Sequence, residues 1–209
     1  MEIYIVRHGE TQWNKEEVFR GRKDIPLNDT GKRQAELAGA YFRGIPVKKI
    51  ISSPLARAVE TAAAISAATG VLVESMEELT DINFGIWEGL SLKEVEERYP
   101  DAFALWRISP EKLRIADGET LAEVRERISR GLARAADVAG AVVIVTHRAI
   151  CKILVLALLH IENEHFWAIK YDPGSITLLE GDGSRFTLIF SNDTCHQRDG
   201  VQGAHYRDF

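Results

Sequence analysis

Residues 3–11 decide the fold class, and they read Ile3-Tyr4-Ile5-Val6-Arg7-His8-Gly9-Glu10-Thr11. The first four residues are β-branched or aromatic, so they predict a buried strand, and the polar residues that follow predict its end. In open α/β sheets, ligands bind beyond the carboxyl ends of the strands. This stretch therefore predicts an α/β fold and the end of the sheet at which chemistry takes place.

Strand-like runs recur at residues 49–52, 71–73 and 141–145, with helical patterns between them at 30–43, 54–69 and from 120 onward. Thr120 and Glu123 form a capping-box signature at the start of the last helix. This alternation predicts a sheet covered by helices. Near the C-terminus, two further runs flank Gly181-Asp182-Gly183, which is a hairpin signal, so we expect a mixed sheet.

Length and composition favour one globular domain. A chain of 209 residues suits a single domain, 1–209, and we expect residues 81–110, with their short helical patterns, to form a lid-like insertion over one end of the sheet. A net charge of −5 argues against nucleic acid as a partner. No apolar run reaches the roughly 20 residues of a membrane span. Two cysteines without metal or disulfide spacing, and no signal-peptide pattern, predict a cytoplasmic protein.

Polar clusters follow three of the predicted strands, and they are Arg7-His8-Gly9-Glu10-Thr11, Ser53-Pro54-Leu55-Ala56-Arg57 and Thr146-His147-Arg148. Loops at the carboxyl ends of strands can converge on one site. Two imidazoles and at least two guanidiniums in one pocket would repel one another, and an anion relieves that repulsion. The sequence therefore predicts an anion-binding pocket.

A phosphate monoester is the anion that this chemistry favours. Arginine presents a planar fork to phosphate oxygens, and a neutral imidazole can attack phosphorus. A helix beginning near Ile150 would add backbone N–H groups beside His147. Phosphoryl transfer asks chiefly for positioning and charge stabilisation, so we expect no metal and no cofactor. A Walker loop, zinc-type spacing and a nucleophile-elbow serine are all missing from the sequence.

The order and spacing of these motifs resemble the histidine phosphatase superfamily, also called the phosphoglycerate mutase-like family. The matching motifs are Arg7-His8-Gly9-Glu10-Thr11-x-x-Asn14, Gly21-x-x-Asp24-x-Pro26-Leu27, Ser53-Pro54-Leu55-x-Arg57, Phe84-Gly85-x-Trp87-Glu88-Gly89, Gly118-Glu119-Thr120 and Val145-Thr146-His147. They run in order from residue 3 to about residue 160. The resemblance implies a three-layer α/β/α sandwich with a mostly parallel mixed sheet.

The resemblance also implies a set of catalytic roles. A phosphohistidine would form on His8, and Arg7, Arg57 and His147 would hold the phosphoryl oxygens. Substrate-binding residues would be Asn14, Arg20 and Gly21. The expected substrate is a small phosphorylated metabolite.

Two positions depart from the family pattern. Asp81 occupies the place of the family's glutamate general acid, and it is one methylene shorter. Asp81 could instead be a turn or cap residue, with Glu78 and Glu88 as alternative acids. Arg148 follows the second histidine, where relatives often carry glycine. We hypothesise that Arg148 selects an additional negative group on the substrate.

Three functions compete. The first is a metal-independent phosphomonoester phosphatase, in which water takes the phosphoryl group from His8. The second is a phosphoglycerate mutase; mutases of the family carry a longer basic insertion after the position of Asp81, whereas this chain proceeds directly to Phe84-Gly85. The third is a catalytically inactive phosphate-ligand binding protein. The apolar helix at 150–159 could pack on the sheet or form part of a dimer face, and in the second case a homodimer is expected.

Overall fold

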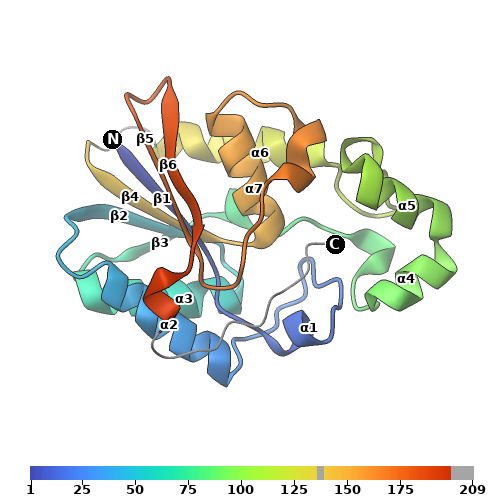
Figure 1. The fold of residues 1–209 in the computed structure, drawn as a ribbon, viewed down its shortest axis with the longest axis horizontal. Helices are drawn as coiled ribbons and strands as arrows, with labels where there is room; N and C mark the ends of the chain where they lie inside the picture. The colour runs from blue at the N-terminus through green and yellow to red at the C-terminus, as the bar shows by residue number, and fades with distance from the viewer. Residues whose placement is uncertain (136–138, 199–209) are drawn as a thin grey trace.

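One mixed sheet forms the centre of the structure, a computed structural model that describes residues 1–135 and 139–198 (Figure 1). Its strands are β1 (Glu2–Arg7), β2 (Val47–Ser52), β3 (Val73–Ser75), β4 (Ala141–Thr146), β5 (Ile176–Gly181) and β6 (Phe186–Asp193). Their order across the sheet is β3-β2-β4-β1-β5-β6. Strands β1 to β4 run parallel to one another. At one edge of the sheet, β5 pairs antiparallel with β1, and β6 pairs antiparallel with β5. The predicted mixed sheet and hairpin are confirmed.

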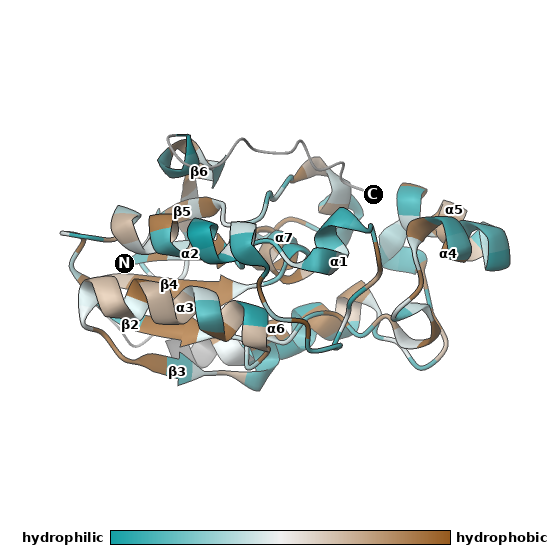
Figure 2. Ribbon diagram, turned by 90° about the horizontal axis from the view of Figure 1, so that it is seen from below, coloured by the Kyte–Doolittle hydropathy of each residue, from teal (hydrophilic) through white to brown (hydrophobic). Residues whose placement is uncertain are grey.

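Helices cover both faces of this sheet. They are α1 (Gln12–Lys15), α2 (Asp29–Tyr41), α3 (Ala56–Thr69), α4 (Leu92–Arg98), α5 (Pro100–Ile108), α6 (Leu121–Ala135) and α7 (Arg148–Leu158). Short 3-10 helices are η1 (Glu77–Leu79), η2 (Gly85–Trp87), η3 (Pro110–Lys112), η4 (Asn163–Ala168) and η5 (Cys195–Gln197). Figure 2 shows α2 and α3 on one side of the sheet and α6 on the other. The three-layer sandwich is confirmed.

The strand sequences explain the two apolar layers, because successive side chains of a strand point to opposite faces. In β1, Ile3 and Ile5 are buried in the core beneath α6 and α7. Tyr4 and Val6 are buried in the core beneath α3. Both cores meet at the central strands β1 and β4, so the carboxyl ends of these strands are held rigidly.

Some predicted boundaries were wrong by two residues. The third strand spans residues 73–75 instead of 71–73. The helix expected from Pro54 begins at Ala56, because Leu55 is an extended N-cap residue. The helix expected near Ile150 begins at Arg148, with His147 as its N-cap residue.

The apolar helix α7 is packed inside the chain. Nine of its residues are buried, including Ile150 and Leu154, which are 0% exposed. Of the two alternatives for this helix, the structure shows packing inside the chain, because the sheet and the neighbouring helices cover it. A homodimer stays a prediction without a surface assigned to it.

The insertion lies beyond one end of the sheet. In Figures 1 and 2, α4 and α5 project from the body of the molecule on the side of α1. The residues Trp87, Phe103 and Trp106 anchor it, because all three are buried in the larger core. Its function as a lid stays a prediction. Within the described ranges, no helix has both the length and the apolar character that crossing a membrane requires.

Candidate active site

The adjacent carboxyl ends of β1 and β4 bring the two histidines side by side. Arg7, the last residue of β1, is in register with Thr146, the last residue of β4, and a histidine follows each of them. The backbone N–H of His8 donates to the carbonyl of Thr146 at 2.9 Å. The two imidazole centroids are 5.2 Å apart, and both side chains are fully buried. The two rings therefore face one small volume.

The ring of His8 is oriented by its own loop. Its Nδ1 lies 2.6 Å from the carbonyl oxygen of Gly9, which can only accept, so Nδ1 carries the proton. Its Nε2 is buried and has no hydrogen-bond partner among the described residues. Burial, and then the guanidiniums of Arg57 and Arg7, lower the pKa of His8 well below its ordinary value. His8 therefore presents a neutral nitrogen lone pair to the pocket.

His147 is neutral for similar reasons. Arg57 Nε donates to His147 Nδ1 at 3.2 Å, so His147 Nε2 carries the proton and donates to Ser53 Oγ at 2.7 Å. Burial and the charge of Arg57 lower the pKa of His147 well below its ordinary value. As the N-cap residue of α7, His147 also lies at the positive end of a helix dipole.

Arg57 connects several parts of the site. It lies in the first turn of α3 and is fully buried. Its Nη1 donates to the carbonyl of Lys23 and its Nη2 to that of Gly21, both at 2.9 Å. Glu60, in the next turn of α3, accepts from the backbone N–H of Leu27 and forms no ion pair with Arg57 within the described residues. Arg57 thus holds the loop at residues 20–24 against the histidines.

Two more arginines add positive charge. Arg7 is 2% exposed, and its Nη1 donates to the carbonyl of Tyr171 at 2.5 Å. Arg20 has a buried Nε without a hydrogen-bond partner among the described residues. Burial, and then the charges of Arg7 and Arg57, lower the pKa of Arg20, whereas Asp81 opposes that effect. The guanidiniums of Arg57, Arg7 and Arg20 therefore all act on His8.

Gly21 and Asn14 shape the rim of the pocket. Gly21 has φ +51°, and a Cβ there would lie 1.9 Å from Glu88 Oε1, so another residue would be strained and would displace the Glu88 side chain. Asn14 Oδ1 accepts from the backbone and hydroxyl of Thr11, both at 2.9 Å. Because its oxygen fixes this turn, the amide nitrogen of Asn14 is the group left to meet a ligand.

Asp81 is the carboxylate that reaches His147 and Arg57. Its Oδ2 lies 3.3 Å from Arg57 Nη2 and 3.7 Å from His147 Nδ1. Its Oδ1 accepts from the backbone of Ile82 at 3.0 Å. Glu88 instead accepts from the backbone N–H groups of Arg22 and Phe84, which makes it a support of the loops. Glu78 is partly exposed beside α6.

The comparisons with known proteins agree with this geometry. The family model of the histidine phosphatase superfamily (branch 1) matches residues 3–194. The chain belongs to the histidine phosphatase superfamily. Phosphoserine phosphatase 1 of Hydrogenobacter thermophilus is 31% identical over 207 residues, 98% of each chain.

Solved structures are similar over almost the whole chain. Bacillus stearothermophilus YhfR has a TM-score of 0.88 at 30% identity, and the match covers 93% of this chain and 98% of that one. A mycobacterial glucosyl-3-phosphoglycerate phosphatase solved with VO3 has a TM-score of 0.86 at 27% identity, with 92% and 99% covered. The chain is a phosphoric monoester hydrolase of this superfamily, whose members transfer phosphoryl groups through a histidine.

Sequence reasoning missed three residues that support the site of this histidine phosphatase. Ser53 accepts from His147, although the sequence indicated only that Ser53 belongs to the second polar cluster. Glu119 stood out in the sequence only as part of the Gly118-Glu119-Thr120 motif, and it pairs with Arg127 and Arg22. Arg127 lies on α6 with the periodicity of an ordinary helix, so no sequence signal distinguished it. Among the described residues, no group of three or more His, Cys, Asp or Glu side chains could hold a metal ion.

Proposed function

We propose that this chain hydrolyses small phosphate monoesters by double displacement through His8, with the site residues in the following roles. The observation that carries the proposal is the buried, unpartnered Nε2 of a neutral His8 among three guanidiniums. An unpaired buried nitrogen costs stability, so its retention favours a functional role. A bound phosphoryl group would give this atom its partner.

Binding comes first. Arg7 and Arg57 hold the phosphoryl oxygens, and the Nε2–H of His147 exchanges Ser53 Oγ for one of them. Asn14 and the N-terminal backbone of α7 add donors. His8 Nε2 attacks phosphorus while the bond to the ester oxygen breaks, and Asp81 gives its proton to the leaving alkoxide. Water then attacks the phosphohistidine, Asp81 takes a proton from that water, and the P–N bond breaks. Inorganic phosphate leaves and the starting protonation states return.

Phosphate release from p-nitrophenyl phosphate in the presence of EDTA tests the reaction. Wild type is expected to turn over without added metal, and His8→Ala is expected to be inactive. Equal inactivity of both proteins would instead favour a phosphate-ligand binding protein. In a panel of metabolite phosphates, 3-phosphoglycerate with a trace of the bisphosphate tests for mutase activity, which the direct run from Asp81 to Phe84 disfavours.

We propose further that the substrate carries a second negative group that meets Arg148. This residue begins α7 directly after His147, it is half-buried, and its charge acts on Arg20. A relative named phosphoserine phosphatase makes phosphoserine a suitable probe. Phosphoserine and phosphoethanolamine differ by one carboxylate, so they form a matched pair.

Arg148→Gly is expected to lower kcat/KM for phosphoserine about 10- to 100-fold, because a hydrogen bond to a charged group contributes about 1.5–3 kcal/mol. For phosphoethanolamine, little change is expected. Arg130→Gly is a control on α6, because Arg130 is exposed and pairs only along its own helix with Glu126. An unchanged preference between the two esters in Arg148→Gly would remove this idea.

The cellular setting is a proposal as well. Cys151 is buried and Cys195 is exposed, and both are free thiols. Free thiols persist in a reducing compartment, so we place the enzyme in the cytoplasm.

A further inference from the structure

Asp81 lies on a segment with little regular structure of its own. It follows the single turn η1 and precedes η2. An aspartate has one methylene less than a glutamate, so its carboxylate can meet the leaving oxygen only if the backbone is held close to the pocket. The position of the segment at residues 78–83 is therefore decisive for proton transfer in this chain.

Arg127 holds this segment from α6. Its Nη1 donates to the carbonyl of Glu78 at 2.5 Å, and its Nη2 donates to the carbonyl of Asp81 at 3.2 Å. Arg127 is 8% exposed, so these bonds lie out of water. Because the guanidinium is planar and donates to two carbonyls, it fixes the position and the orientation of the backbone between Glu78 and Asp81.

Glu119 holds Arg127 in turn. Its two carboxylate oxygens accept from Arg127 Nε at 2.9 Å and Nη2 at 3.1 Å. The same carboxylate accepts from the backbone N–H of Asn83 at 2.9 Å. Burial opposes its charge, yet the hydrogen bonds from Arg127 and Asn83 keep the pKa of Glu119 below its ordinary value. The Arg127–Glu119 pair therefore forms hydrogen bonds with the backbone on both sides of Asp81, at Glu78 and at Asn83.

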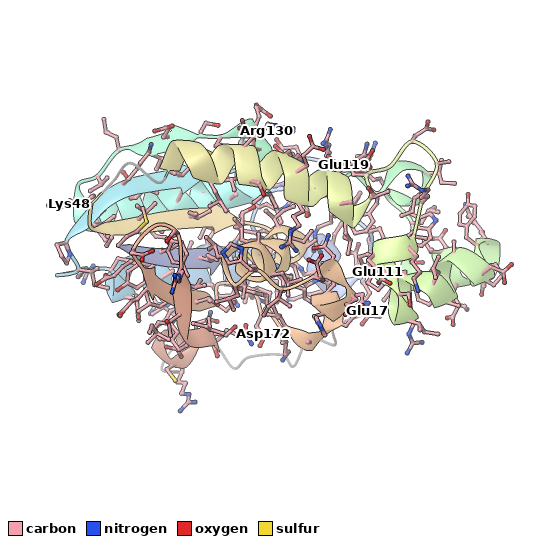
Figure 3. All side chains as sticks on the ribbon, turned by 90° about the horizontal axis from the view of Figure 1, so that it is seen from above. Glu17, Lys48, Glu111, Glu119, Arg130 and Asp172 are labelled. Carbon is pink, nitrogen blue, oxygen red and sulfur yellow. The ribbon has the colours of Figure 1, made fainter. Side chains whose placement is uncertain are left out.

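The same carboxylate reaches a second loop of the site. Arg22 Nη2 lies 3.0 Å from Glu119 Oε1, and Arg22 adjoins Gly21, whose carbonyl accepts from Arg57. Figure 3 labels Glu119 at the end of α6 that faces the insertion. One ionised side chain thus joins the Asp81 segment to the loop that lines the phosphate pocket.

We propose that Arg127 and Glu119 are positioning residues, which hold Asp81 where it can protonate the leaving oxygen. This inference rests on the proposed role of Asp81 as the proton donor. Neither residue touches the reacting atoms, so each acts through the backbone of the segment. Loss of Arg127 would leave phosphate binding in place and would weaken proton transfer.

Leaving-group dependence separates this role from a merely structural one. p-Nitrophenyl phosphate and phenyl phosphate have similar shapes, but p-nitrophenolate needs little protonation to leave, whereas phenolate needs more. The ratio of their kcat/KM values therefore reports on the proton donor, because kcat/KM covers only the steps up to phosphorylation of His8 and departure of the leaving group. Because general acid catalysis contributes about 10²–10⁴-fold, Asp81→Asn is expected to raise this ratio about tenfold or more.

Arg127→Gln is expected to raise the ratio in the same direction as Asp81→Asn. Arg125→Gln is the matched control, because Arg125 is also on α6 and also donates to a backbone carbonyl, that of Ile161, away from the site. Arg127→Lys keeps the charge and one donor nitrogen, so it is expected to give an intermediate ratio. This variant keeps the test valid if the glutamine variant does not fold. Glu119→Gln is expected to behave like Arg127→Lys.

The outcomes are distinguishable. Suppose that Asp81→Asn shifts the ratio, but Arg127→Gln lowers both rates equally and keeps the ratio seen in wild type and in Arg125→Gln. The positioning role is then overturned, while the role of Asp81 stands. If Asp81→Asn leaves the ratio unchanged, the proposed proton donor is wrong and the inference falls with it.

Discussion

The proposed anion pocket and the Asp81 segment differ in whether their buried polar groups are hydrogen-bonded. In the pocket, buried atoms such as His8 Nε2 and Arg20 Nε have no hydrogen-bond partner among the described residues. In the segment, the ion pair of Arg127 with Glu119 satisfies the backbone on both sides of Asp81. The pocket therefore carries unpaired polar atoms that cost stability, whereas the segment uses its polar groups to stabilise the fold. Substitutions should separate the two regions accordingly.

The largest effect is expected in the pocket. His8→Ala removes the nucleophile, so kcat on p-nitrophenyl phosphate should fall about 10⁴-fold or more. The melting temperature should stay the same or rise, because a buried and unpaired imidazole nitrogen is lost. Phosphate release and thermal unfolding measure the two effects. A strongly lowered melting temperature would contradict the contrast between the regions.

Arg57→Lys should have the next largest effect. Lysine keeps the charge but cannot reach Lys23, Gly21 and His147 at the same time, as the three guanidinium nitrogens do. We expect kcat/KM to fall about 10²–10³-fold, as for loss of one preorganised electrostatic contact. Steady-state kinetics at constant pH measure the change. A loss below about fivefold would mean that charge alone is sufficient.

The pH dependence of stability should show the smallest effect. The pKa values of His8 and His147 are lowered in the folded protein, so below about pH 6.5 the unfolded chain binds protons that the folded chain does not. Stability is therefore lost as the pH falls, and each histidine contributes up to about 1.4 kcal/mol per pH unit. Urea unfolding at pH 6.5 and 5.5 measures the slope. His8→Asn should have a shallower slope than wild type, and equal slopes would contradict the burial of a neutral His8.

The sheet and the pocket could be predicted from the sequence because local rules govern them. The alternation of Ile3 to Val6 fixes which side chains meet each face, and parallel neighbours bring polar residues to one edge. Arg7, His8 and His147 lie at the ends of neighbouring strands. Their proximity could therefore be predicted without knowing the course of any long loop. Arg57 follows from the short turn after β2.

The support around Asp81 could not be predicted in the same way. Glu119 and Arg127 are eight residues apart, but Glu119 precedes α6, so no helical repeat relates them. Their contacts with residues 78–83 depend on how a loop of irregular backbone crosses α6. Helix boundaries were also missed where the cap is unusual, as at His147, because its extended backbone places the first helical residue at Arg148.

Rapid-quench turnover with a labelled phosphate ester, followed by peptide mapping under alkaline conditions, tests the central claim most directly. Our account predicts phosphate on the peptide that carries His8, bound through nitrogen, and no label in His8→Ala. Phosphate on His147 or on any other residue would contradict it.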